Sequence, residues 1–192
     1  MLSFASKAAV AMSMLIAGSG AAVAESAISA PEYNVKAGYL LLFIRYVTWP
    51  DTTFASPQSF IIVGVLGRDP FGKVLEETFA DAAGMTGRKT EIRRVSDVAG
   101  AMGCHVVFIS DFESGHTAEW LAALRDKPIL TVTETEEGAD AGSIINFIKE
   151  GNRVRFEVNL MAAHRVGLKI ASPVLVSARN VGKQGGKEEG NP

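Results

Sequence analysis

Residues that commonly carry chemistry are few in this chain. The three histidines, His105, His116 and His164, have no neighbours at the spacing of metal ligands. Cys104 is the single cysteine, which excludes a cysteine-based zinc site. The chain also lacks a G-x-S-x-G motif. The sequence therefore predicts no enzyme, no metal site and no cofactor.

Two further patterns have both a chemical and a structural interpretation. The segment GVLGRDPFG follows an apolar run and opens a predicted helix, as phosphate-binding loops do. It matches neither G-x-G-x-x-G nor the lysine-containing P-loop, which favours a tight turn capped by Asp69. The acidic run of Glu134, Glu136 and Glu137 could hold a cation loosely, but such runs usually form a solvated surface.

The segment INFIKEGNRVRFEVN, Ile145 to Asn159, gathers the polar residues of most interest. Gly151-Asn152 suits a two-residue turn of type I′ or II′ between two strands. Since side chains alternate along a strand, one face is apolar apart from Lys149. The turn sets three cross-strand pairs on the other face: Glu150 with Arg153, Ile148 with Arg155, and Asn146 with Glu157.

That polar face has two interpretations. It is a solvated surface held by cross-strand pairs such as Glu150 with Arg153 and Asn146 with Glu157. Alternatively it is a recognition surface with Arg155 as its anchor, because arginine is enriched at interfaces.

The elements that must position these residues alternate between strands and helices. Strands are predicted at 59–67, 88–96, 105–110 and 128–135. Helices are predicted from Pro31 to about 48, from Pro70 to the glycines at 84 and 87, and at 97–102, 117–126, 160–168 and 172–181. Residues 136–143 are predicted as a loop by their Gly, Asp and Ser content. This order predicts a three-layer α/β fold, with a mostly parallel sheet, helices on both faces and an antiparallel C-terminal hairpin.

The N-terminus is typical of a secretory leader. Lys7 precedes an uncharged run, and Ala22-Val23-Ala24 fits a signal peptidase site, which predicts a signal peptide over 1–24. A membrane anchor is the alternative, but the apolar run is short and interrupted by Gly and Ser. Residues 25–182 are predicted as one domain, and 183–192 as a disordered, Gly-rich and charged tail. The net charge of −2 gives no basis for nucleic-acid binding.

Cys104 also has two interpretations. It precedes the predicted strand HVVFIS, where a small buried apolar side chain fits well. The alternative is an intermolecular disulfide or a redox sensor, since an exported protein meets an oxidising compartment.

Five segments, in their order and spacing, resemble the YfiR family of periplasmic regulators. They are KAGYLLLFIRYVTWP, IIVGVLGRDPFG, GCHVVFIS, PILTV and GSIINFIKEGNRVRFEVNLMAAHRVGLKIAS. The resemblance extends from about Lys36 to Ala178. It implies a periplasmic α/β protein without enzymatic activity that binds the periplasmic part of an inner-membrane diguanylate cyclase and holds it inactive.

The resemblance further implies a partner at the outer membrane that sequesters the repressor, a homodimer, and an output in cyclic di-GMP and biofilm. Relatives are expected to carry further cysteines and to use disulfides, whereas Cys104 stands alone here. By their geometry, the candidate partner-binding residues are Trp49, Asn146, Arg153, Arg155 and Glu157.

Two other function classes stay open. A periplasmic small-ligand binding protein that feeds a sensor or transporter would use the loops after Leu66, Ser110 and Thr135, at the carboxyl ends of strands. An enzyme is the third class, and would need a pocket with paired titratable groups.

Overall fold

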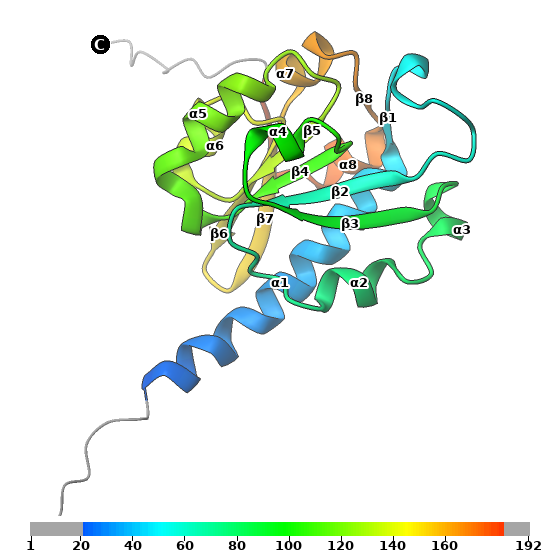
Figure 1. The fold of residues 1–192 in the computed structure, drawn as a ribbon. Coiled ribbons are helices and arrows are strands. Elements are labelled where there is room, and N and C mark those ends of the chain that lie inside the picture. Colours follow the sequence, from blue (N-terminus) through cyan, green and yellow to red (C-terminus); the bar gives the residue numbers. More distant parts are fainter. Residues whose placement is uncertain (1–20, 183–192) are drawn as a thin grey trace, which may run out of the picture.

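A seven-stranded sheet forms the middle layer of the fold (Figure 1). The computed structural model describes residues 21–182. The strands lie in the order β3-β2-β4-β5-β6-β7-β9. Their bounds are β2 Ile61–Leu66, β3 Thr90–Val95, β4 Val106–Ile109, β5 Leu130–Thr133, β6 Ile145–Glu150, β7 Arg153–Asn159 and β9 Asn180–Gly182. Neighbours from β3 to β6 are parallel, β7 is antiparallel to β6, and β9 is parallel to β7.

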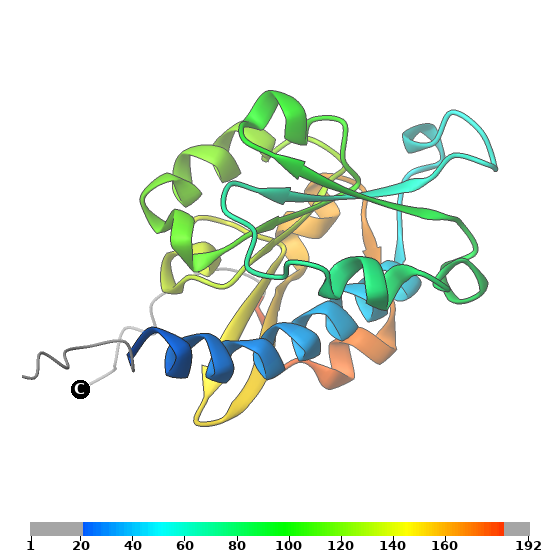
Figure 2. The same ribbon diagram turned by 60° about the horizontal axis from the view of Figure 1, so that its bottom comes forward.

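Helices cover both faces of this sheet (Figure 2). One face carries α1 Ala21–Tyr46, α2 Val74–Phe79 and α8 Ser172–Ser177; the other carries α4 Val98–Ala101, α5 Ser114–Leu124 and α6 Glu136–Asp140. The remaining helices are α3 Ala83–Thr86 and α7 Leu160–Arg165, with 3-10 turns at Asp51–Thr53 and Asp111–Glu113. The predicted fold class, three-layer α/β with a mostly parallel sheet and an antiparallel hairpin, is confirmed.

Each face of the sheet has its own apolar cluster. The larger one joins α1 to the sheet through Leu40, Phe43, Phe108 and Phe147. The smaller one packs α4 and α5 on the other face, around Leu66, Val107, Ile109, Leu121 and Leu124. Strands β4 and β5 are buried along their whole length, as continuous apolar runs predict for central parallel strands.

The β6–β7 hairpin has the predicted register. Glu150 pairs with Arg153, Ile148 with Arg155, and Asn146 with Glu157. Gly151 has a φ of +57°, which the predicted tight turn requires. Phe147 and Phe156 face α1, where the Phe156 ring lies 4.9 Å from that of Phe43 and 5.1 Å from that of Tyr39.

Two predicted helix starts are wrong. Helix α1 is already present at Ala21, the first described residue, ten residues before Pro31, and the alanine-rich residues before Pro31 have high helix propensity. Helix α2 begins at Val74 and not at Pro70. Asp69 Oδ1 accepts from the Phe71 N–H at 2.7 Å, and Gly72 has a φ of +57°, so the chain turns before the helix starts.

Four short elements were missed, and three of them, β1, β8 and β9, form only beside strands that are distant in the sequence or in a separate segment. Residues 136–143 contain α6, although a loop was expected. The helix expected at 172–181 ends at Ser177, and Asn180–Gly182 forms β9 beside β7. Strands β1 Val47–Thr48 and β8 Lys169–Ile170 form a small antiparallel sheet that ties the end of α1 to the C-terminal region.

The expected leader, residues 1–24, lies largely outside the described residues, and the expected tail, 183–192, lies wholly outside them. Within residues 21–182, no helix combines the length and apolar character needed to cross a membrane.

Candidate functional site

The hairpin polar face, defined as Asn146, Ile148, Glu150, Arg153, Arg155 and Glu157, is the outer face of β6 and β7. Helix α1 covers the opposite face of the hairpin, whereas α4 and α5 pack over Leu66, Val107 and Ile109 of the central strands. A groove of about 860 Å³ therefore opens between the hairpin, α5 and α6. Its polar lining includes Arg125, Asp140, Asn146, Glu157, Asn159 and Arg165.

Asn146 is the fixed point of this surface. It is 4% exposed, and its Oδ1 accepts a hydrogen bond from the Thr133 hydroxyl at 2.7 Å. The same hydroxyl lies 2.9 Å from that of Ser143. Gly138 of α6 packs so closely that a Cβ there would stand 2.9 Å from Asn146 Oδ1. Asn146 is thus positioned by β5 and α6, and supports the surface more than it projects from it.

The charged residues of the face pair differently from the expectation. Glu150 forms salt bridges with Arg179, whose Nε lies 2.7 Å away, and with Arg155, whose Nε lies 3.8 Å away. No described salt bridge links Glu150 to Arg153. Sequence reasoning missed Arg179 because it was assigned to a helix, whereas it lies just before β9. Arg155 and Glu150 are each 41% exposed in their side chains, so their charges reach solvent.

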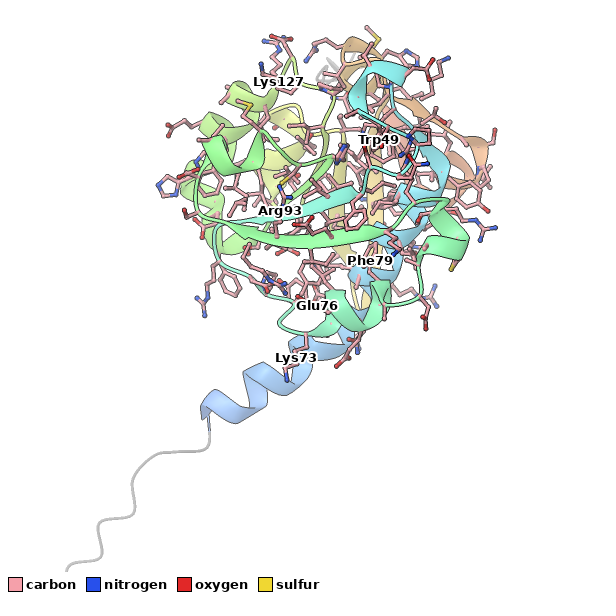
Figure 3. The ribbon with its side chains drawn as sticks, turned by 45° about the vertical axis from the view of Figure 1, so that its right-hand side comes forward. Trp49, Lys73, Glu76, Phe79, Arg93 and Lys127 are labelled. Carbon is pink, nitrogen blue, oxygen red and sulfur yellow. The ribbon has the colours of Figure 1, made fainter. Side chains whose placement is uncertain are left out.

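Trp49 is placed inside the molecule, where the chain leaves α1 and β1 (Figure 3). It is 7% exposed, and its indole N–H donates to the His105 carbonyl at 3.3 Å. Its ring meets Phe54 edge-on at 6.2 Å. Trp49 therefore presents little surface to a partner and acts through packing.

The environment of His105, beside Trp49, predicts that the free energy of unfolding depends on pH. Its Nδ1 accepts from the Ile62 N–H at 3.0 Å, and Phe54 stacks on its ring at 4.6 Å. Burial, with Arg88 and Arg93 nearby, lowers the pKa of His105 below its usual 6.5.

We expect the free energy of unfolding to fall as the pH drops below about 6.5, because the unfolded chain then binds a proton that folded His105 resists. Above that pH His105 is neutral in both the folded and the unfolded state, so it no longer changes the free energy of unfolding. His105→Asn keeps an acceptor near Ile62 and should flatten this part of the curve in urea titrations between pH 5 and 8. The same replacement at exposed His164 is the control; equal curves for His105→Asn and the natural protein would contradict the assignment.

Cys104 is buried against the centre of the sheet. Its Sγ lies so near Gly64 that a Cβ there would stand 2.7 Å away. Burial raises the pKa of the thiol, which lowers its reactivity. The environment favours a packing role for Cys104.

The crevice at the carboxyl ends of the parallel strands is filled by the chain itself. Lys36 Nζ of α1 lies 2.5 Å from Glu134 Oε2, after β5, and 2.5 Å from Glu32 Oε1. Glu134 Oε1 also accepts from the Tyr33 hydroxyl at 2.9 Å and from the Asp111 N–H at 3.0 Å. Burial, then the Glu134 charge, raises the pKa of Tyr33. A small ligand at this edge would have to displace Tyr33 and Lys36, which weighs against the alternative of a ligand-binding protein.

Comparisons with known proteins place the chain in a family. Two solved structures are distantly similar: a conserved domain protein from Vibrio cholerae O1 biovar El Tor (14% identity, TM-score 0.45, 64% of this chain and 55% of that one) and the ABC domain in complex with L-Trp from Streptococcus pneumoniae (11% identity, TM-score 0.46, 62% and 54%). The chain thus spans little more than half the length of either. No curated protein matches. The model of the YfiR/HmsC-like family matches residues 33–179, well over half of the chain. This chain belongs to the YfiR/HmsC-like family.

Proposed function

We propose that this protein is a periplasmic inhibitory binding protein that holds an inner-membrane diguanylate cyclase inactive and so lowers cyclic di-GMP and biofilm output. The observation that carries the proposal is the family membership over residues 33–179. The proposal includes the predicted leader over 1–24, cleavage after Ala24, a homodimer, and a partner at the outer membrane that sequesters the protein.

The mechanism is a shift between two states of the cyclase. A bound protein favours the state for which its affinity is higher, by no more than the difference in binding free energy. This protein would therefore bind the inactive state of the periplasmic domain more tightly than the active one. No bond is made or broken in this mechanism.

The surface proposed for recognition is the hairpin polar face. Arg153, Arg155 and Glu157 supply its exposed or half-buried charges, and the buried Asn146 anchors β6 to β5 through Thr133. Trp49 is buried away from the hairpin, against His105 and Phe54, and belongs to the proposed site only as a residue that supports the fold. Strands are rigid supports, so these charges are presented in a fixed geometry that can discriminate between two states of a partner.

Arg155→Glu tests this surface. Reversing the charge should weaken binding to the cyclase domain by about ten- to a hundredfold, about 1.4–2.8 kcal/mol, and raise cyclic di-GMP in cells that express both proteins. Arg93→Glu is a closely matched control, because Arg93 on β3 is also a strand arginine with a 41% exposed side chain and one acidic neighbour. The measurements are titration calorimetry and cyclic di-GMP quantification. Equal effects of both replacements would argue against the hairpin surface, and no change in cyclic di-GMP on deletion of the protein would refute the regulator function itself.

A further inference from the structure

The outer edge of β7 is only partly covered. Strand β9 pairs with β7 over Glu157 to Asn159, and the Arg179 N–H donates to the Phe156 carbonyl at 2.9 Å. Among the described residues, no strand pairs with β7 on that side of Arg153, Val154 and Arg155. The hairpin therefore ends in a short stretch of free strand edge.

The hairpin register shows which backbone groups this edge offers. Opposed residues in an antiparallel pair alternate between those that bond each other and those that point outward. The backbone N–H of Asn159 donates to the Ile144 carbonyl on the β6 side. The backbone carbonyl of Phe156 instead points away from β6 and accepts from the Arg179 N–H. Val154 lies two residues before Phe156, opposite Lys149, so its backbone N–H and C=O also point away from β6. The N–H and C=O of Val154 and the N–H of Phe156 are thus available to an added strand.

A second groove, of about 670 Å³, runs along this edge. It lies between α1 and the hairpin tip and is lined by Glu32, Val35, Tyr39, Lys149, Asn152, Arg153, Val154 and Arg155. Glu32, Val35 and Tyr39 recur at helical spacing and form one stripe of α1. Val35 is 46% exposed, so this stripe offers an apolar contact beside free backbone groups.

The charges along this edge indicate which kind of segment it would bind. Arg153, Arg155 and Lys149 are cationic, and the one acidic residue of the lining, Glu32, already binds Lys149 at 2.9 Å and Lys36 at 2.5 Å. Two copies of this protein paired through the same edge would bring Arg153 and Arg155 against like charges, which disfavours self-association here. An extended segment with acidic residues has the complementary charge.

We infer that the free edge of β7 receives an extended acidic segment of the partner, which adds as a strand beside Arg153–Phe156. This inference rests on the proposed function, because it specifies how the cyclase is held. In such an addition the backbone bonds supply affinity, and alternate side chains supply specificity. Acidic side chains would face Arg153 and Arg155, and an apolar one would lie toward Val35 and Tyr39.

The test uses Val154→Pro in the full mature chain, with the periplasmic domains of the membrane diguanylate cyclases encoded in the same genome as probes. Proline removes the outward N–H of Val154 without removing a bond between β6 and β7. We expect at least tenfold weaker binding. Val154→Thr keeps the N–H and the β-branched shape, and should bind within about twofold of the natural protein. Urea unfolding of both variants checks the fold.

Amide hydrogen exchange on the natural protein gives a second measurement that needs no variant. The Val154 and Phe156 amides should exchange quickly in the free protein and at least tenfold more slowly in the complex. If Val154→Pro binds as tightly as Val154→Thr, or if these amides stay unprotected in the complex, the strand addition is refuted while the regulator function stands. If the natural protein binds none of the cyclase domains, the proposed function is refuted, and the strand addition with it.

Discussion

Lys36→Met is expected to lower the free energy of unfolding by about 3–5 kcal/mol, the usual effect of removing one member of a buried ion pair. The Lys36 side chain is 7% exposed and that of Glu134 3%. Without Lys36, Glu134 keeps the Tyr33 hydroxyl and the Asp111 N–H but has lost its cation in a site that water barely reaches. Chemical denaturation in urea at neutral pH measures the loss.

Two further variants make this prediction specific. Lys149→Met removes another lysine bound to Glu32, but its side chain is 58% exposed, so we expect a loss within about 1 kcal/mol. The double variant Lys36→Met with Glu134→Leu should be more stable than Lys36→Met alone, because no charge is left buried. Equal losses for Lys36→Met and Lys149→Met would show that Lys36 contributes no more than a surface lysine.

Gly138→Ala is expected to destabilise the domain by about 1–3 kcal/mol and to displace Asn146. The new Cβ would lie 2.7 Å from Thr133 Cβ and 2.9 Å from Asn146 Oδ1. Thr133 is fully buried on a central strand and cannot move aside, so the strain falls on its bond to Asn146. The groove beside α6 should change shape, and binding to the proposed cyclase partner should weaken in parallel.

Gly115→Ala in α5 is the control, because beyond the helix's own backbone no atom lies within 4 Å of its added Cβ. Helix propensity predicts a change between zero and about 1 kcal/mol of added stability. Urea midpoints and the chemical shifts of Thr133 and Asn146 report both variants. A Gly138→Ala protein with natural stability and unmoved Asn146 resonances would contradict the packing argument.

Local patterns predicted the parts of the fold that local physics determines. The Gly151-Asn152 turn and strict alternation set the hairpin register correctly, and continuous apolar runs identified the buried strands. Strand β9 and the β1–β8 pair were missed because each is two or three residues long and exists only through a distant partner. No periodicity marks such short segments.

The Lys36 cluster could have been found from the sequence. Lys36, Leu40 and Phe43 recur at the spacing of one helix face. The apolar character of Leu40 and Phe43 predicts that this face points into the core, where both residues lie. A lysine on that stripe must be buried, and a buried lysine needs acidic partners. The choice of Glu134 as a partner depends on where β5 ends relative to α1, which only the three-dimensional structure gives.

The small β1–β8 sheet bears on how the chain folds. It joins Val47 to Ile170, and α1 also packs on β7 and α8. The apolar core around α1 is therefore complete only when the last quarter of the chain is in place. Contacts between residues so far apart in sequence close large loops and slow folding. Synthesis of the N-terminal half therefore does not complete a folded unit, and the chain stays without its full core until about residue 178 is available.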